Sequence, residues 1–519
     1  MNQKLNNEIQ ILVNKYKYGD FNGVLNKCSS LVKKFPKNDF LWNLTGLSFQ
    51  RIGKQENAIT SFKNAIDHNP NNNSAKNNLG ISYKIMRRYS EAEKIFKELL
   101  IKDPNYVNAI INLANLKKDT YFLDEATAYY KKALNINKNL PELHLNLSSI
   151  LQVENRMDEA KKHLFKALEI KNNFSTVDQT LSMLLDYKDA ESSKHLTSML
   201  DKLKNNELND NDKILLNFAL GKAFEDKEDY ENSFKYYEKG NYIKDTKIKS
   251  NIDYYRKKAE KIKNYFLNIN LNEINTYSDT RKKIFILGLP RSGTTLIEKI
   301  ISSHPKVGSV SEIGFIYEKI NNYITTNYEI DETKVSHLIN RNFGEEYNNF
   351  LEFFNVKNDY VLDKTLINFW YIGFIKIFFP KSKIIHSFRN PKDNCLSIFK
   401  NLFPMTINEK WLYNQEEMGE YYLIYNDMMK FWNKLFNNEI YNLKYEDLVN
   451  DKENKIKELI KYCDLDWNDK CLDHHKNTNP IKTLSINQAN KPIYKSSINK
   501  SKFYENKLTK LYSILDKLN

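Results

Sequence analysis

The stretch FILGLPRSGTTLIEKI, from Phe285 to Ile300, contains the pattern that decides the fold of this 519-residue chain. A short apolar run leads into a loop with two glycines and then into an apolar helical pattern, which is the order of a strand, a phosphate-binding loop and a helix. At such a helix start, free backbone N–H groups and the helix dipole both favour an anion. Gly288 and Gly293 have the spacing of a Walker loop, but Thr294 occupies the position of the Walker lysine. The segment therefore predicts a phosphate site that differs from the Walker type.

Short apolar runs alternate with longer helical patterns through the second half of the chain. The runs are KIFIL, which leads into the loop, then DYVL, SKIIHSF and EIYNL, and a further short run, KVGSV, precedes Glu312. This alternation is typical of βαβ units and predicts a parallel sheet. We therefore expect an α/β domain of the phosphate-loop type over residues 282–515, preceded by a helical connector over residues 251–281.

A repeat of 34 residues organises the first half of the chain. Pro36, Pro70 and Pro104 recur at this interval, and each ends a pattern of two helices. The period is that of tetratricopeptide repeats, in which small residues let two helices approach closely and aromatic residues fill the space between pairs. The two clearest units place residues at the usual offsets: Trp42, Gly46, Phe49, Ala58, Phe62, Ala65 and Pro70 in one, then Leu79, Gly80, Tyr83, Ala92, Phe96 and Pro104 in the other.

Weaker units of the same kind follow. They contain Ala114, Ala126, Tyr130 and Ala133, then Leu147, Ala160, Leu164 and Ala167, and finally an isolated unit with Gly221, Phe224 and Tyr237. We therefore expect an α-solenoid over residues 5–250, with its last units degenerate. Stacked helix pairs form a concave surface, which predicts a protein or peptide as the bound partner. The alternative is that the solenoid only supports the second domain or joins it to a second copy.

A second anion-binding motif lies downstream of the loop. KIIHSFRNPKDNCLS combines a strand with Arg389 at its end and Ser397 on a helix that we expect to begin near Pro391. An arginine can hold a phosphate through two parallel N–H bonds, and a serine hydroxyl can add another bond. Either residue alone also fits a structural salt bridge or helix cap. Together, and downstream of the first loop, they indicate a second phosphate site.

The two motifs together resemble those of sulfotransferases, whose donor is 3′-phosphoadenosine 5′-phosphosulfate. LPRSGTTL, from Leu289 to Leu296, is similar to the family's phosphosulfate loop P-[KR]-S-G-T-T, where the cation lies within the loop. The resemblance covers roughly residues 282–511 and is highest for bacterial sulfotransferases with tetratricopeptide repeats in the same chain. It implies sulfuryl transfer without a metal ion. It also implies that the donor is bound by Pro290, Arg291, Ser292, Gly293, Thr294, Thr295, Arg389 and Ser397.

Four further residues match the same family. Glu312 lies where protein-tyrosine sulfotransferases carry a glutamate proposed as general base, and Lys364 lies where they carry a lysine near the bridging oxygen of the donor. Ser485 and Lys491 belong to a segment that resembles the loop closing over the nucleotide. The resemblance thus implies catalytic roles for Glu312, Arg291 and Lys364. These residue types suit proton removal from an acceptor and stabilisation of a departing phosphate oxygen. Glu312 and Lys364 also fit ordinary structural roles at strand ends.

Composition narrows the class of protein. The net charge is +14, yet lysine and asparagine are spread along the whole chain without a basic block, so we expect no nucleic-acid partner. The first residues lack the apolar core of a signal peptide, and no apolar run is long enough to span a membrane, which predicts a cytoplasmic protein. The four cysteines show no C-x-x-C or zinc pattern, so we expect a reducing compartment and no bound metal.

Three functions stay open at this point. The first is a sulfotransferase whose repeats present the acceptor or a partner. The second is a P-loop kinase or NTPase that would use Asp363 to hold magnesium, and the third is an inactive repeat scaffold. The displaced cation and the pair Arg389 and Ser397 favour the first. Protein tyrosine is the leading acceptor hypothesis, with a sugar hydroxyl, an amine or a small phenol as alternatives. His304 is a second possible base, which we interpret as structural because it precedes Pro305 in a turn. The oligomeric state is not predicted.

Overall fold

A computed structural model describes residues 2–190, 192–205, 208–269, 281–321, 330–331, 333, 335, 343–354, 356–404, 407, 409–437, 439–477 and 486–518. These residues form two compact units. One consists of Met1–Ile150 with Phe353–Asn355, and the other of Leu151–Glu352 with Val356–Asn519.

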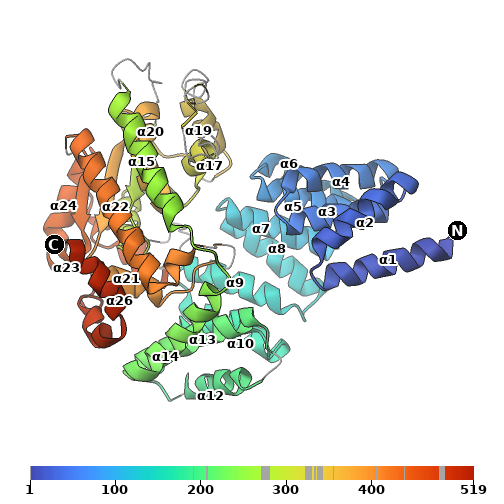
Figure 1. The fold of residues 1–519 in the computed structure, drawn as a ribbon, viewed down its shortest axis with the longest axis horizontal. Helices are drawn as coiled ribbons and strands as arrows, with labels where there is room; N and C mark the ends of the chain where they lie inside the picture. Colours follow the sequence, from blue (N-terminus) through green and yellow to red (C-terminus); the bar gives the residue numbers. More distant parts are fainter. Residues whose placement is uncertain are drawn as a thin grey trace. The chain divides into compact units, whose positions relative to one another are not determined.

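The first unit is built from successive antiparallel helices (Figure 1). They are α1 (Asn2–Lys17), α2 (Phe21–Lys34), α3 (Asp39–Arg51), α4 (Gln55–His68), α5 (Asn73–Ile85), α6 (Tyr89–Lys102), α7 (Val107–Asp119), α8 (Leu123–Ile136) and α9 (Pro141–Val153), the last of which crosses the boundary between the units.

Close helix contact at glycine explains the repeat pattern. In α3, a Cβ on Gly46 would lie 2.5 Å from the Phe62 ring of α4, and in α5 a Cβ on Gly80 would lie 2.6 Å from the Phe96 ring of α6. Each glycine is therefore the position at which the aromatic ring of the paired helix rests. Hydrogen bonds join neighbouring pairs, since the Asn78 amide of α5 donates to the side-chain oxygen of Asn43 in α3 at 3.0 Å. The predicted tetratricopeptide-like array is confirmed by this packing.

The helices of residues 151–268 pack in the second unit, together with the sheet. They are α10 (Met157–Ile170), α11 (Ser175–Ser182), α12 (Ser192–Leu203), α13 (Asp210–Asp226), α14 (Tyr230–Asp245) and α15 (Ile252–Asn268). Gly221 of α13 repeats the glycine contact, because a Cβ there would lie 2.6 Å from the Tyr237 ring of α14. The predicted domain boundaries at residues 250 and 281 rest on the sequence repeats and stay a prediction. By packing, helices α10 to α15 belong to the same compact unit as the sheet.

Five parallel strands form the sheet, in the order β2-β3-β1-β4-β5. They are β1 (Lys282–Leu287), β2 (Val307–Ser311), β3 (Tyr360–Asp363), β4 (Lys383–Phe388) and β5 (Tyr441–Lys444). Each strand lies on one of the five apolar runs of the sequence, so the prediction of a parallel α/β domain is confirmed. The central strand β1 lies between β3 and β4, and its register pairs Ile284 with Leu362 and Phe285 with Ile384.

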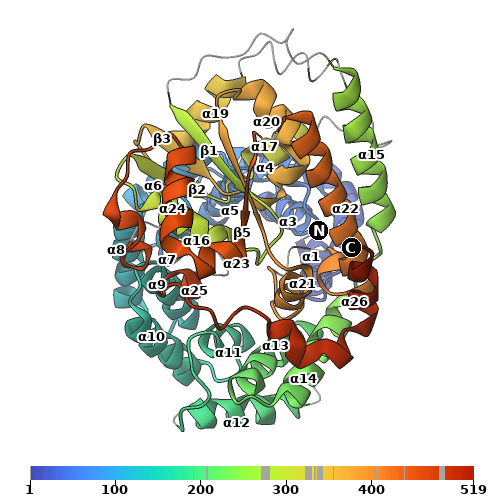
Figure 2. The same ribbon diagram turned by 90° about the vertical axis from the view of Figure 1, so that its left-hand side faces the viewer.

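Helices cover both faces of the sheet (Figure 2). On one face, the isoleucines of β1 at positions 284 and 286 pack against α16 (Thr294–Ser302), α23 (Tyr445–Asn450) and α24 (Lys452–Tyr462). On the other face lie α20 (Ile372–Phe378), α22 (Gln415–Leu435) and α15, and the Phe266 ring of α15 lies 5.1 Å from the Trp432 ring of α22. The alternation of strand side chains between two helical layers thus produces a three-layer α/β/α domain.

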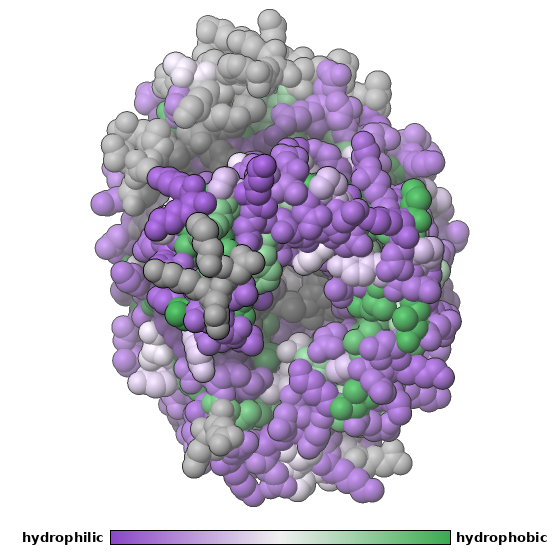
Figure 3. Space-filling view, turned by 90° about the vertical axis from the view of Figure 1, so that its right-hand side faces the viewer, coloured by the Kyte–Doolittle hydropathy of each residue, from purple (hydrophilic) through white to green (hydrophobic). Residues whose placement is uncertain are grey.

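The remaining elements follow the strands or lie near the C-terminus. They are α17 (Phe315–Asn321), α19 (Phe343–Leu351), η2 (Leu366–Tyr371), α21 (Pro391–Phe399), η3 (Lys410–Leu412), η4 (Asp469–Cys471), η5 (His474–Lys476), α25 (Ile486–Ala489), η6 (Lys500–Lys507), α26 (Thr509–Leu515) and η7 (Asp516–Leu518). The face shown in Figure 3 is mainly hydrophilic, with hydrophobic residues scattered over it. Among the described helices, none is both long and apolar enough to cross a membrane.

Candidate functional site

The charged candidate residues gather at the carboxyl edge of the sheet. Glu312, Lys364 and Arg389 are each the first residue after their strands, β2, β3 and β4, and the loop with Arg291 follows β1. Parallel strands all end at the same edge, so the sheet brings these four residues to one side of the domain. Because β1 is flanked by β3 and β4, the loop lies between the residues that the other strands contribute.

The loop after β1 has a special backbone conformation that hydrogen bonds hold in place. Arg291 has a φ of 67° and Gly293 a φ of 101°, which are left-handed conformations. The Ser292 hydroxyl donates to the Leu289 carbonyl at 2.8 Å, and the Ser387 hydroxyl of β4 donates to the Ser292 carbonyl at 2.8 Å. These bonds fix the loop from within and from the neighbouring strand.

Helix α16 begins directly behind this loop. Gly293 provides its N-cap without a side-chain hydrogen bond, and Thr294 and Thr295 are its first, buried residues. A helix start without a capping side chain leaves backbone N–H groups available, and the helix dipole adds positive potential there. The local structure therefore has the backbone features that suit an anion, and an anion site at this loop stays a prediction.

The second motif meets the first in space. Arg291 Nε donates to the Ser397 hydroxyl of α21 at 3.2 Å. Arg389 is 7% exposed and donates through one terminal nitrogen to the Ser497 carbonyl at 2.5 Å. Its Nε is buried and, among the described residues, has no hydrogen-bond partner. Since a buried guanidinium N–H without a partner is costly, this atom marks a position that suits an anionic ligand.

One cavity of about 1080 Å³ joins these residues. Its lining includes the predicted residues Arg291, Gly293, Thr294, Thr295, Arg389, Ser397 and Lys491. The opposite wall consists of residues from α11, α13 and α14, among them Phe218, Lys222 and Tyr237. The helices of the last repeat unit thus form part of the same cavity as the anion loop.

Two guanidinium groups, those of Arg291 and Arg389, line this cavity. Burial, with the like charge of Arg389, lowers the pKa of Arg291 to about 10. The Arg389 guanidinium carbon also lies 5.0 Å from the centre of the Tyr445 ring, and the nearest carboxylates, those of Asp393 and Glu446, are 3.9 and 4.0 Å away. Both are ion pairs at the longest separations that such pairs have, too long for a hydrogen bond.

A carboxylate–lysine–carboxylate group lies at the ends of β2 and β3. The Lys364 ammonium is fully buried and donates to Glu312 at 2.5 Å, while its distance to Glu298 of α16 is 3.5 Å. Burial lowers the pKa of Lys364, but Glu312 and Glu298 outweigh that effect and hold it above the usual value. The Glu298 carboxylate accepts hydrogen bonds from the Ser309 and Ser311 hydroxyls of β2. The lysine is therefore a fixed cation beside a half-exposed carboxylate, Glu312.

Some of the predicted donor residues do not line the cavity. The Pro290 carbonyl accepts from the Asn394 amide at 2.8 Å, and the Ser292 side chain is used inside the loop. Neither residue is part of the cavity lining. Ser485 lies outside the described residues, whereas Lys491 is exposed at the cavity wall.

Asp363 and His304 have structural contacts. Asp363 is 1% exposed and accepts hydrogen bonds from the Thr365 hydroxyl at 2.6 Å and the Tyr347 hydroxyl at 2.9 Å. Burial raises the pKa of Asp363 to about 6, against the effect of these hydrogen bonds. His304 Nε2 donates to the Asp466 carbonyl at 3.0 Å. Asp363 does not line the cavity, so its geometry gives no support to a magnesium-holding role.

Comparison with known families agrees with both halves of this architecture. Residues 283–469 match the family model described as "Sulfotransferase family". Residues 74–102 and 215–246 each match a model described as "Tetratricopeptide repeat". The chain combines a sulfotransferase domain with tetratricopeptide repeats. The second repeat match covers most of α13 and α14, the helices that line the cavity.

Individual relatives add little beyond this assignment. An uncharacterized protein of Aquifex aeolicus (strain VF5) is 29% identical over 318 residues, which are 57% of this chain and 41% of that protein. The chain thus spans about two fifths of that relative's length. Two solved repeat proteins are similar to parts of the chain. One, from Parabacteroides merdae ATCC 43184, is 16% identical with a TM-score of 0.35 and covers 46% of this chain and 93% of its own. The other, from Thermus thermophilus, is 18% identical with a TM-score of 0.30, and the match covers 35% of this chain and 98% of that protein.

Three residues of the sulfotransferase domain's site were missed by sequence reasoning. Glu298 forms an ion pair with Lys364, and the ring of Tyr445 lies under the Arg389 guanidinium. The Ser497 carbonyl accepts a hydrogen bond from Arg389. A sequence signal existed for two of them. Glu298 is an acid within an apolar helical run, where it requires a partner. Tyr445 directly follows β5, and so lies at the same carboxyl edge as Lys364 and the other strand-end residues.

We predict that Gly293→Ala weakens binding of 3′-phosphoadenosine 5′-phosphate by about tenfold or more. A Cβ at this position would lie 2.6 Å from the Tyr445 ring, and the φ of 101° disfavours any other residue. Such backbone strain costs about 1–3 kcal/mol. Gly53→Ala is the matched control, because Gly53 has a φ of 80° but no atom within 4 Å of its Cβ position. Equal affinity of both variants, measured by titration calorimetry, would contradict a binding role for the loop.

Proposed function

We propose that this protein transfers a sulfuryl group from 3′-phosphoadenosine 5′-phosphosulfate to an acceptor hydroxyl. The observation that carries the proposal is the single cavity shared by the loop after β1 and the motif after β4. A donor with a phosphosulfate at one end and a 3′-phosphate on its ribose needs two separate anion sites. The helix start at Thr294 and the Nε of Arg389, which has no hydrogen-bond partner among the described residues, support two such sites.

The residues present suit the donor chemically. The uncapped start of α16 and Arg291 offer N–H groups for the phosphosulfate. Arg389 offers a buried N–H that has no hydrogen-bond partner among the described residues, and the Ser397 hydroxyl lies within hydrogen-bond distance of Arg291. These contacts support a 3′-phosphate at the second site, the group that distinguishes this donor from ATP.

The proposed reaction assigns a role to each group at the strand ends. The acceptor oxygen forms a bond to sulfur while the bond between sulfur and the bridging phosphate oxygen breaks. Glu312 takes the proton of the acceptor hydroxyl. The electrons of the broken bond stay on the departing 3′-phosphoadenosine 5′-phosphate, whose new charge is stabilised by Lys364 and Arg291. The products are the sulfated acceptor and the nucleotide bisphosphate.

We propose further that the repeats present the acceptor, or a protein that carries it. Support comes from the cavity wall that α11, α13 and α14 provide opposite the loop. The tyrosine hydroxyl of a protein is the first acceptor to test, and a sugar hydroxyl is the second. Both use the same donor site, so the donor can be tested before the acceptor is known.

The donor is tested by thermal stabilisation. We expect 3′-phosphoadenosine 5′-phosphate to raise the melting temperature in the presence of EDTA, and ATP with magnesium to raise it much less. The reason is that only the first ligand carries a phosphate for Arg389. Equal shifts with the two ligands would favour a P-loop kinase or NTPase instead.

Arg389→Ala sharpens the same test. A hydrogen bond to a charged group contributes about 1.5–3 kcal/mol to binding. Its loss should therefore lower the affinity for the bisphosphate about 10- to 100-fold. Adenosine 5′-phosphosulfate lacks the 3′-phosphate, and its affinity should change far less. Arg156→Ala removes an exposed arginine that is paired with Glu154 and Glu159 on the surface, and should leave both affinities unchanged.

A further inference from the structure

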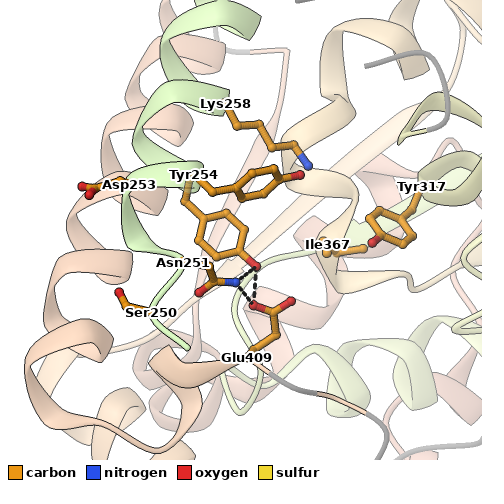
Figure 4. Close-up of a pocket in the computed structure, with 9 residues that line it drawn as sticks. Ser250, Asn251, Asp253, Tyr254, Lys258, Tyr317, Ile367 and Glu409 are labelled. Atoms are coloured by element: carbon orange, nitrogen blue, oxygen red, sulfur yellow. Dashed lines mark hydrogen bonds between the residues drawn. The ribbon is translucent and has the colours of Figure 1, made fainter. Parts of the chain in front are cut away.

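A second cavity lies in the same compact unit, beneath helix α15 (Figure 4). Its volume is about 620 Å³, within the range of small-molecule sites. Tyr254 and Lys258 of α15 line one side, and Tyr317 of α17 and Ile367 of η2 line the other. Figure 4 shows the Lys258 amine and the Tyr317 hydroxyl directed into the same space from opposite sides.

Lys258 is an unusual lining residue. It is 2% exposed, and its ammonium donates to the Tyr371 hydroxyl at 2.8 Å and lies 5.1 Å from the centre of the Trp370 ring. Within the described part of the chain it forms no ion pair. Burial lowers the pKa of Lys258 to about 7. A buried ammonium without a carboxylate partner is unfavourable, so an anion brought into the cavity would be stabilised there.

The nearest acid of the cavity has its own partners. Glu409 accepts hydrogen bonds from the Asn251 amide at 2.8 Å and from the Tyr255 hydroxyl. These contacts, drawn as dashed lines in Figure 4, hold the carboxylate at the start of α15. Glu409 thus attracts Lys258 electrostatically but does not pair with it.

Two lining residues of the cavity lie on the segments that follow the ends of β2 and β3. Tyr317 follows Glu312 by five residues, and Ile367 follows Lys364 by three. Glu312 and Lys364 are themselves in contact at 2.5 Å. The two segments that carry the proposed base and cation therefore continue directly into the elements that line this cavity, η2 and α17.

Resting on the proposed function, we propose that this cavity is the acceptor subsite, and that Lys258 binds a carboxylate which the acceptor carries near its reactive hydroxyl. The tyrosine rings at positions 254 and 317 provide flat apolar surfaces for the acceptor's ring. The acceptor class is thus a ring-bearing hydroxy acid, either phenolic or sugar-like, free or as part of a polymer.

The test compares acceptors that differ only in charge. The probes are 3-(4-hydroxyphenyl)propionate and its neutral amide, with D-glucuronate as the sugar acid. Binding to the full chain is measured by titration calorimetry without donor, and sulfuryl transfer is measured with donor. We expect the wild-type protein to bind the propionate at least about tenfold more tightly than the amide, because a hydrogen bond to a charged group is strong.

Lys258→Met should abolish that difference, and Lys257→Met should preserve it. Lys257 is the exposed neighbour on the same helix, so it controls for loss of charge on α15. Lys258→Met should fold normally, since replacing a buried charge by an apolar side chain of similar length is well tolerated. Its melting temperature should therefore not fall. Glucuronate binding that depends on Lys258 would identify a sugar acid, and binding of the aryl acid alone would identify a phenolic acceptor.

Three results would overturn or separate the proposals. An unchanged preference for the carboxylate in Lys258→Met, or an equal loss of affinity for both aryl probes, would overturn the subsite. Equal sulfation of the charged and neutral phenols by wild type and variant would overturn it while upholding the proposed function. A carboxylate preference that depends on Lys258, without sulfuryl transfer to any acceptor, would uphold the binding site and reject the proposed function.

Discussion

Glu312→Gln should lower kcat by about 10²- to 10⁴-fold, the usual contribution of a general base, while the affinity for the donor changes little. The amide keeps the size of the side chain but cannot accept the proton of the acceptor hydroxyl. Donor binding should persist because Glu312 is not part of the lining of the donor cavity. Rates at saturating donor, together with titration of 3′-phosphoadenosine 5′-phosphate, measure the two effects separately.

The position of Glu312 makes alternative outcomes informative. Its carboxylate contacts Lys364, so a variant that lost donor affinity or melted well below wild type would indicate a positioning role for Glu312. Near-normal turnover would remove Glu312 from the mechanism. Glu453→Gln changes an exposed glutamate of α24 that pairs with Lys457, and it should affect neither rate nor affinity.

Much of the fold follows from short-range patterns in the sequence. The recurrence of Gly46 and Gly80 at the repeat interval predicted close helix pairs, and both glycines do contact an aromatic ring of the paired helix. The apolar runs predicted the five strands. Strands β1 to β4 are largely buried, and buried parallel strands need apolar residues on both faces. The edge strand β5 is only partly buried. The same patterns do not predict which helices pack together. The grouping of α13 and α14 with the sheet depends on contacts between distant parts of the chain. One of them is the hydrogen bond that the Asn241 side-chain amide donates to the Phe399 carbonyl at 2.9 Å.

The candidate site was predictable where a residue follows a strand. Arg389 and Lys364 could be placed from the sequence because the carboxyl ends of parallel strands share one edge. Glu298 could not be placed in this way. Its contact with Lys364 requires α16 to lie against β2 and β3 in one register, and nothing in the local sequence specifies that register. The same holds for Lys258, which looks like an ordinary surface lysine in the helix KKAEKIKNYF.

Lys364→Met should lower kcat by about 10²- to 10³-fold, the effect of removing one donor aimed at developing charge. The same change should also destabilise the protein. Glu298 is fully buried, and one of its oxygens has no hydrogen-bond partner among the described residues. Without Lys364 its charge would be uncompensated, and breaking a buried pair in this way costs about 3–5 kcal/mol. Thermal melting and steady-state rates therefore report two different consequences of one substitution.

The double variant Glu298→Gln with Lys364→Met separates stability from catalysis. A neutral glutamine at position 298 removes the uncompensated charge and can still accept from the Ser309 and Ser311 hydroxyls, which now bond to Glu298. We expect its melting temperature to return most of the way to wild type while kcat stays low, since the cation beside the departing oxygen is still absent. Recovery of turnover together with stability would show that Lys364 acts only by neutralising Glu298. Lys376→Met removes a lysine that pairs with the exposed Glu439 at 2.7 Å, and because such pairs contribute less than about 1 kcal/mol, it should change neither quantity.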